Sequence, residues 1–151
     1  MKEFESVDDI LDFAIDREQE AVDFYTDAAG TVDKDWMKQV FKQFASEEKG
    51  HKAKLQAVKK GAKLMPHQEK VMDLKVGDYL AEVELTETMT YQQMLILAMK
   101  REKIAFRLYN DLAGKVDDED VKNLFLGLAQ EEAKHKLRFE VEYDDLILKD
   151  N

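Results

Sequence analysis

The sequence contains no cysteine, one proline and only six glycines among its 151 residues. Without cysteine, it has no disulfide, zinc ribbon, iron–sulfur cluster or thiol nucleophile. The shortage of proline and glycine leaves little material for the many turns of an all-β fold. No basic-then-apolar leader opens the chain, and no apolar run approaches the roughly 18 residues of a membrane span. We therefore expect a cytoplasmic protein with no membrane partner.

The sequence also has fewer basic than acidic residues. The chain has 23 lysines and arginines against 33 acidic residues, a formal net charge of −10. Nucleic-acid binders concentrate Lys and Arg to neutralise phosphate, so we expect no nucleic-acid partner. Charged residues make up 37% and hydrophobic residues 44% of the chain, which is typical of long amphipathic helices. The length favours a single domain over residues 1–151.

The sequence also contains an internal repeat. Aligned with itself at an offset of 84 residues, it is identical at 18 of 45 ungapped positions between residues 11 and 55. Shared helical composition alone rarely keeps one register at that level, so we interpret the match as a duplication. The matched pairs include Arg17/Arg101, Glu18/Glu102, Tyr25/Tyr109, Gly30/Gly114, Glu48/Glu132 and His51/His135.

Each repeat is predicted to be a helical hairpin, because its apolar residues recur at the 3–4 spacing of one helical face. Gly30 and Gly114 are expected to end the first helix of each hairpin, and Asp33 and Asp117 to cap the second. The second helix should stop near residue 61 in the first repeat and near residue 148 in the second.

The segment between the hairpins, residues 62–88, has 27 residues and contains Pro66 and Gly77. It is too long for the 2–8 residue turn usual between neighbouring helices of a bundle. It has the length of a strand-like or partly helical crossover that runs along a bundle. The sequence therefore predicts an all-α four-helix bundle made of two duplicated hairpins joined by a long crossover.

Two Glu-x-x-His pairs occupy equivalent places in the repeats, Glu48 with His51 and Glu132 with His135. Residues three apart project from one helical face about one turn apart, so each pair can reach the same ion. The third histidine, His67, lies in the crossover, and we interpret it as structural or solvated.

The other two helices supply one glutamate each, Glu18 and Glu102, with Ala and Tyr at +3 and +7 on the same face. Either carboxylate alone would be expected to reach solvent from the edge of the apolar stripe. Repetition in both halves, opposite two Glu-x-x-His pairs, favours metal ligation instead, since a core-facing carboxylate must be paired or coordinated. The duplication groups the six residues into two equivalent triads, Glu18/Glu48/His51 and Glu102/Glu132/His135.

Charge and ligand chemistry favour two metal ions. Four buried carboxylates would repel one another, and two divalent ions balance them. One Glu from each of two helices with Glu-x-x-His from the other two is the ligand pattern of di-iron and di-manganese carboxylate proteins. Carboxylate and imidazole without thiolate favour iron or manganese over structural zinc. We predict two iron ions, with manganese or a mixed pair as the alternative.

Residues beside the predicted ligands have other assignments. Tyr25 and Tyr109, two turns after the glutamates, are either core tyrosines with satisfied hydroxyls, hydrogen-bond donors to ligating carboxylates, or one-electron donors. Glu47 and Glu131, each one residue before a ligand, should point about 100° away and be solvated.

The segments REQEAVDFY (17–25) and REKIAFRLY (101–109), with the two EExxH helices (47–51 and 131–135), resemble the rubrerythrin branch of the ferritin-like superfamily. The resemblance covers nearly the whole chain. It implies a ferritin-like bundle, often dimeric, with a non-haem diiron centre. It also implies chemistry with hydrogen peroxide or dioxygen, using electrons from a rubredoxin.

The sequence departs from that family in two respects. Rubrerythrins usually carry a rubredoxin domain with two Cys-x-x-Cys pairs, which this sequence lacks, so the electron donor should be a separate protein such as a rubredoxin. They also have a further glutamate three residues after the third-helix ligand, where this sequence has Ala105. The resemblance then implies a six-ligand site closer to that of ferritins and bacterioferritins.

Three functions remain open from the sequence. The first is a diiron oxidoreductase that reduces peroxide or dioxygen with electrons from an external donor. The second is an iron-handling protein of ferroxidase or storage type. The third is a metal-dependent structural module without turnover. We expect a homodimer in the first case, whereas storage would require a closed cage of many subunits.

Overall fold

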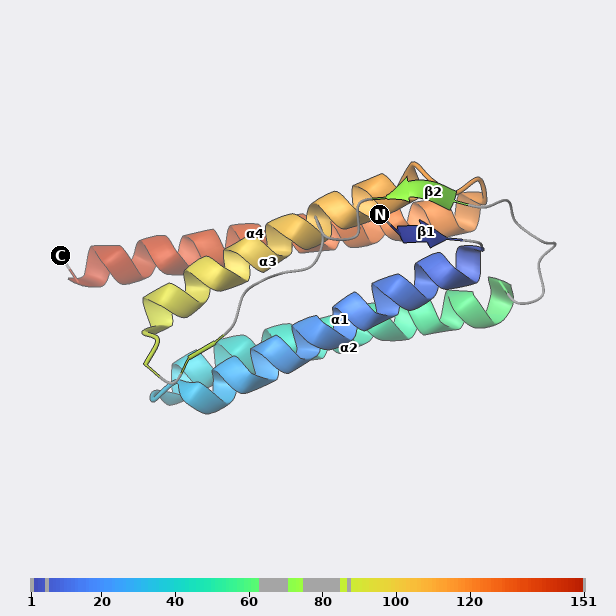
Figure 1. Cartoon of the computed structure of the whole chain (residues 1–151). Helices are drawn as coiled ribbons and strands as arrows, with labels where there is room; N and C mark the ends of the chain where they lie inside the picture. The colour runs from blue at the N-terminus through green and yellow to red at the C-terminus, as the bar shows by residue number, and fades with distance from the viewer. Residues whose placement is uncertain (1, 5, 63–70, 75–84, 87, 151) are drawn as a thin grey trace.

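The computed structural model describes residues 2–4, 6–62, 71–74, 85–86 and 88–150. The helices α1 and α2 lie side by side as one antiparallel hairpin, and α3 and α4 form the second (Figure 1). This arrangement confirms the predicted all-α bundle of two hairpins. In chain order the elements are β1 (Lys2–Phe4), α1 (Val7–Thr31), α2 (Asp35–Ala62), β2 (Val71–Leu74), α3 (Tyr91–Ala113) and α4 (Glu119–Asp150).

The connection between the hairpins spans the bundle, because α2 ends at one end of it and α3 begins at the other (Figure 1). Within this connection β2 pairs with β1 as a two-stranded antiparallel sheet. A strand-like crossover was predicted, whereas β1, only three residues long, was not. Pro66, His67 and Gly77 lie outside the described residues.

Side chains satisfy the free amides at three helix starts. Ser6 Oγ accepts from the amide of Asp9 at 3.1 Å at the start of α1. Thr90 and Gln93 form a reciprocal capping box at the start of α3, with distances of 3.1 and 2.9 Å. The side chain of Asp118 accepts from the amide of Val121 at 2.9 Å at the start of α4.

The predicted helix boundaries are wrong by one or two residues at several places. The N-cap of α4 is Asp118 rather than Asp117, and α2 begins at Asp35, so Asp33 does not cap it. Gly30 lies inside α1, which ends at Thr31 with Val32 as its C-cap, whereas Gly114 does cap α3 as predicted. Neighbouring aspartates compete for a cap, and the spacing of apolar residues does not choose between them.

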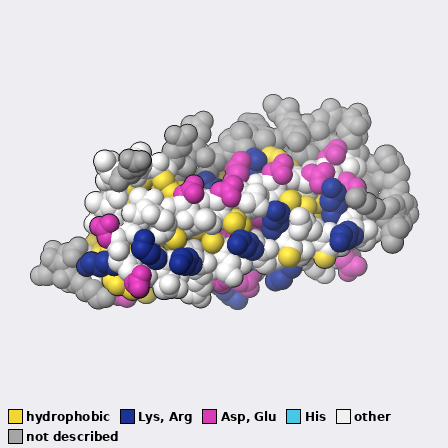
Figure 2. Space-filling model, turned by 90° about the horizontal axis from the view of Figure 1, so that it is seen from below, with side chains coloured by type: hydrophobic (Ala, Val, Ile, Leu, Met, Phe, Trp, Pro, Cys, Tyr) yellow, Lys and Arg dark blue, Asp and Glu magenta, His cyan; other side chains and the backbone are white. Residues whose placement is uncertain are grey.

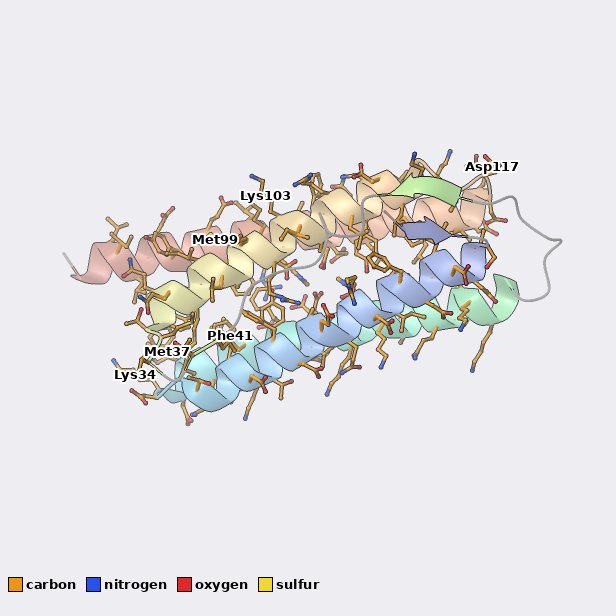
Figure 3. All side chains as sticks on the ribbon, in the orientation of Figure 1. Lys34, Met37, Phe41, Met99, Lys103 and Asp117 are labelled. Atoms are coloured by element: carbon orange, nitrogen blue, oxygen red, sulfur yellow. The ribbon has the colours of Figure 1, made fainter. Side chains whose placement is uncertain are left out.

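The core has two clusters, one around Tyr25 and one around Tyr109. The Tyr25 cluster is rich in aromatic rings. The rings of Phe44 and Phe139 are stacked with their centroids 4.0 Å apart, and Phe41 lies between the hairpins (Figure 3). The Tyr109 cluster is mostly aliphatic. Six buried polar residues come from the same four helices that build these clusters.

The described surface is highly charged, and acidic and basic side chains both occur on the face shown in Figure 2. No histidine is visible on that face, as expected from the burial of His51 and His135. Within the described ranges, no helix has the combination of length and apolar character that spanning a membrane requires.

Candidate metal centre

All six predicted ligands come together inside the bundle. Each helix contributes to the cluster, and every member is buried, with between 1% and 5% of its surface exposed. The members are Glu18 of α1, Glu48 and His51 of α2, Glu102 of α3, and Glu132 and His135 of α4. These are the only charged or polar residues in the buried core of the described chain, so burying them demands a compensating partner.

The ring nitrogen Nδ1 of His51 faces three carboxylates. It lies 3.0 Å from Glu48, 3.1 Å from Glu132 and 3.3 Å from Glu18. The contact with Glu132 joins the two hairpins, because His51 belongs to α2 and Glu132 to α4. His51 is therefore surrounded by oxygen atoms from three helices.

His135 has the equivalent surroundings in the second repeat. Its Nδ1 lies 3.4 Å from both Glu48 and Glu132, and 3.6 Å from Glu102. The two imidazole rings are parallel, with centroids 5.5 Å apart and 8° between their planes. Glu48 and Glu132 thus approach both histidines, whereas Glu18 approaches His51 and Glu102 approaches His135.

This arrangement adds detail to the two equivalent triads that the duplication predicts. One oxygen of Glu48 and one of Glu132 each approach both histidines, so these two carboxylates are shared between the triads. Glu48, His51, Glu132 and His135 can each offer one ligand atom within 4.8 Å of all the others. Two shared carboxylates with one further carboxylate and one imidazole on each side suit a pair of metal ions.

The two tyrosines connect the repeats crosswise. Tyr25 of α1 donates a hydrogen bond to Glu102 of α3 at 2.5 Å, and Tyr109 of α3 donates to Glu18 of α1 at 2.5 Å. Of the three roles left open for these residues, hydrogen bonding to the site's carboxylates is therefore present. Each bond fixes the carboxylate of the opposite repeat. Tyr25 holds Oε1 of Glu102 and leaves Oε2 facing His135, whereas Tyr109 holds Oε2 of Glu18, the same oxygen that faces His51.

The site is electrostatically strained without a cation. Burial, together with the charges of Glu18 and Glu102, raises the pKa of Glu48 well above its usual value. Burial and the charge of Glu102 do the same to the pKa of Glu132. Burial lowers the pKa of His51, but the carboxylates of Glu18 and Glu48 outweigh it and raise the pKa from 6.5 to about 10.

The tyrosine hydroxyls stay protonated in this environment. Burial, then the charge of Glu102, raises the pKa of Tyr25 well above 10. Burial, then the charge of Glu18, does the same for Tyr109. Both residues are thereby kept as hydrogen-bond donors and are poor proton sources.

The donor atoms of the cluster fit a metal site. Several of them are buried without any hydrogen-bond partner, a situation that is rare in proteins and usually marks a function. These atoms are Glu48 Oε1, Glu102 Oε2, Glu132 Oε1, Nδ1 of both histidines and Nε2 of His135. Hard carboxylate oxygens with neutral imidazole are a suitable donor set for iron or manganese.

Glu47 has a role that the sequence did not reveal. It was predicted to be solvated, but its Oε1 lies 3.4 Å from Nε2 of His135, and Arg138 holds both of its oxygens at 2.9 and 3.1 Å. Nε2 of His135 forms no hydrogen bond in the described structure, so Glu47 contributes a negative charge beside the ring rather than a hydrogen bond to it. The counterpart in the other repeat, Glu131, instead lies 3.6 Å from Lys134.

A small cavity of about 30 Å³ adjoins the cluster between α1 and α3. Ala21 and Ala105 line it at equivalent positions of the repeat, as do Arg17 and Arg101. A water molecule needs roughly 10–15 Å³ of such volume, so the cavity holds about two heavy atoms. It reaches Glu18, Glu48, Glu102 and Glu132.

The comparison with known families agrees with this geometry. The rubrerythrin family model matches residues 9–143. The chain belongs to the rubrerythrin family. No curated protein matches it significantly.

Two solved structures show the same bundle. A hypothetical protein from Pyrococcus furiosus has 28% sequence identity and a TM-score of 0.70, over 94% of this chain and 90% of that one. An uncharacterized conserved protein from Magnetospirillum magnetotacticum has 22% identity and a TM-score of 0.70, over 90% and 92%. Family membership and the buried Glu/His cluster together indicate metal binding in this rubrerythrin-family chain, and the individual ligand assignments stay predictions.

Proposed function

We propose that the chain is a non-haem diiron oxidoreductase that reduces hydrogen peroxide or dioxygen with electrons from a separate donor protein. The observation that supports this most is the shared position of Glu48 and Glu132 between the two histidines. Bound as a reduced pair, two ferrous ions supply the two electrons that, with two protons, convert hydrogen peroxide into two molecules of water.

The residues of the chain contribute position and exclusion of water. Tyr25 and Tyr109 hold Glu102 and Glu18 from the opposite repeat, so the outer carboxylates keep a fixed orientation. The aromatic cluster around Tyr25 and the aliphatic cluster around Tyr109 surround the site with apolar side chains that exclude water. The cavity beside Ala21 and Ala105 has room for a molecule of two heavy atoms, the size of peroxide or dioxygen.

Rapid mixing tests this proposal. Protein loaded with two equivalents of Fe(II) per chain, without oxygen, is mixed with hydrogen peroxide in a stopped-flow spectrometer. We expect iron oxidation much faster than that of free Fe(II) under the same conditions. Oxidation no faster than free Fe(II) would contradict the proposal.

An iron-handling ferroxidase is the second candidate. The observation in its favour is Ala105, which leaves the cluster with six ligands and without a further carboxylate at that position. Light scattering separates the two candidates, because a storage protein requires a closed cage of many subunits. A species of dimer size favours the oxidoreductase.

A further inference from the structure

The outer face of the second hairpin carries an open groove between α3 and α4, with a volume of about 430 Å³. Its floor is apolar and consists of Phe106, Ala133 and Leu137, and Leu137 is 59% exposed. Three basic residues, Lys103, Arg107 and Lys136, line its rim together with Glu140. An exposed apolar surface with a polar rim is typical of an interaction site.

The duplication provides an internal control for this groove. At the equivalent positions the first hairpin has Val22 for Phe106, Ala53 for Leu137 and Asp23 for Arg107. Larger apolar side chains and a positive charge therefore occur on one copy of the same surface. The six predicted ligands are identical in both copies, so this surface difference is independent of the metal centre.

One pair of lysines distinguishes the groove from the equivalent positions on the first hairpin. Lys52 of α2 donates to Gln19 of α1 at 2.6 Å, across the surface above the buried Val22. The counterpart of Gln19 is Lys103, which repels rather than accepts from Lys136, the counterpart of Lys52. Lys136 instead pairs with Glu140 along its own helix, and the groove stays open.

The groove is built on the same two helices as the predicted ligands of the second hairpin. Each of these ligands is followed in sequence by a groove residue: Glu102 by Lys103, Glu132 by Ala133 and His135 by Lys136. Lys103 lies on the side of α3 away from the first hairpin (Figure 3). Consecutive residues of a helix point about 100° apart, so a molecule bound in the groove contacts the outer side of the helices that carry the ligands.

The charge of the groove decides which partner suits it. A basic rim on a chain of net charge −10 attracts an acidic surface. A second basic groove, lined by Lys38, Lys42 and Lys49, lies on the first hairpin, but alanines are the largest apolar residues in its lining. The basic rim and the exposed Leu137 together favour a partner whose acidic surface surrounds an apolar contact.

We propose that this groove is the docking site of the electron donor, a small acidic one-electron carrier protein with an apolar contact surface. The inference rests on the proposed function, which needs two electrons per peroxide. Two successive encounters at the groove, each delivering one electron, return an oxidised pair of ferric ions to the ferrous state.

Charge reversal with a matched control tests the site. Lys103→Glu/Arg107→Glu reverses two charges at the groove, and Lys42→Glu/Lys49→Glu reverses two exposed lysines on the first hairpin. Both variants change the net charge equally. The probe is a rubredoxin of net negative charge. Its binding is measured by isothermal titration calorimetry with both proteins oxidised, and its electron transfer by stopped-flow with the rubredoxin reduced.

We expect the groove variant to bind the probe about tenfold more weakly and to be reduced about tenfold more slowly at low salt, with the control near wild type. Leu137→Gln should weaken binding without changing the charge. Equal losses in both charge variants would overturn the proposal, because they would reflect net charge alone. Unchanged binding in the groove variant would also overturn it.

Two further outcomes have definite meanings. If Leu137→Gln converts a wild-type dimer into a monomer in sedimentation experiments, the groove is a self-interface and the proposal is wrong. If only the groove variant loses rubredoxin binding but peroxide does not oxidise the ferrous protein quickly, the docking site is supported and the peroxide reaction is contradicted. The two proposals can therefore fail separately.

Discussion

At the scale of single residues, the crossed hydrogen bonds link each repeat to the other's carboxylate. Tyr25→Phe should free Glu102, and Tyr109→Phe should free Glu18, because each removes the hydroxyl that holds the glutamate. Loss of such a bond to a metal ligand typically weakens metal binding about 10–100-fold. Titration with Fe(II) in the absence of oxygen measures the affinity.

The control for the tyrosines is Tyr91→Phe. Tyr91 donates to Glu142 at 2.9 Å and contacts none of the six ligands in the described structure. Its removal should leave metal affinity unchanged. If Tyr25→Phe and Tyr91→Phe have the same affinity as the wild type, the crossed bonds do not support the site.

The titrating residues predict how the metal-free protein responds to pH. Folding raises the pKa of Glu48 and Glu132 above their usual value and that of His51 from 6.5 to about 10. The folded state therefore binds more protons than the unfolded state. Protonation of His51 contributes fully to the free energy of unfolding below pH 6.5, and this contribution is lost as the pH rises towards 10. The contributions of Glu48 and Glu132 are also lost as the pH rises, starting from about pH 4.5.

We therefore expect the free energy of unfolding of the metal-free protein to fall between pH 6 and 9, measured by urea denaturation. Glu48→Gln/Glu132→Gln should reduce the slope, because two of the groups that prefer to be protonated are replaced by neutral amides. A metal-free protein that becomes more stable over this range would contradict the account.

Glu47 distinguishes the two histidines. Glu47→Gln should weaken metal binding at the His135 side by about tenfold, because it removes the charge at Nε2 that Arg138 holds in place. Glu131→Gln changes the equivalent residue of the other repeat, which faces Lys134, and should have no effect. Binding isotherms measure the metal affinity of the two variants. Equal affinities of Glu47→Gln and Glu131→Gln would exclude this role for Glu47.

Much of the site could be predicted at this scale, and the reason is the repeat. A lone Glu18 would have been taken as a stripe-edge glutamate, but its match with Glu102 placed it among the ligands. Glu47 could not be found in this way, because its role depends on Arg138, whose counterpart is Lys54. A contact between residues 91 positions apart leaves no periodic signal in the sequence.

At the scale of helices, α1 and α3 supply most of the lining of the small cavity beside the cluster. Ala105→Leu should fill the cavity of about 30 Å³, since it adds three carbon atoms beside the cluster. We expect peroxide to oxidise the ferrous protein at least tenfold more slowly, with two metal ions still bound. Ala53→Leu adds the same atoms on the exposed side of α2 and should react normally.

The four helices could be predicted from the spacing of apolar residues, whereas their ends depend on which side chains hydrogen-bond to the free amides. Thr90 and Gln93 are three apart in the pattern of a capping box, and both bonds form. At the start of α4 four acidic residues follow one another, Asp117, Asp118, Glu119 and Asp120, and only the geometry selects Asp118 as the cap. The crossover was predicted from its length, which says nothing about β1 as the partner of β2.

At the scale of the whole molecule, the metal centre joins two hairpins that the sequence presents as copies. Glu18, Glu48 and His51 come from the first hairpin, and their counterparts from the second. Burial and the neighbouring carboxylates disfavour the charged forms of Glu48 and Glu132 in the core. Metal ions bound there would offset that repulsion and would link residues of both hairpins. The two copies differ on their outer faces, where Phe106 and Leu137 of the second hairpin correspond to Val22 and Ala53 of the first.

The number of metal ions bound per chain tests the central claim most directly. Metal-free protein is titrated with Fe(II) without oxygen, and bound iron is counted by elemental analysis after removal of the excess. We predict two ions per chain for the wild type, and a loss of tight binding at both positions in Glu48→Ala, whose carboxylate lies between the histidines. One ion per chain, or two ions retained tightly in Glu48→Ala, would contradict the shared site described here.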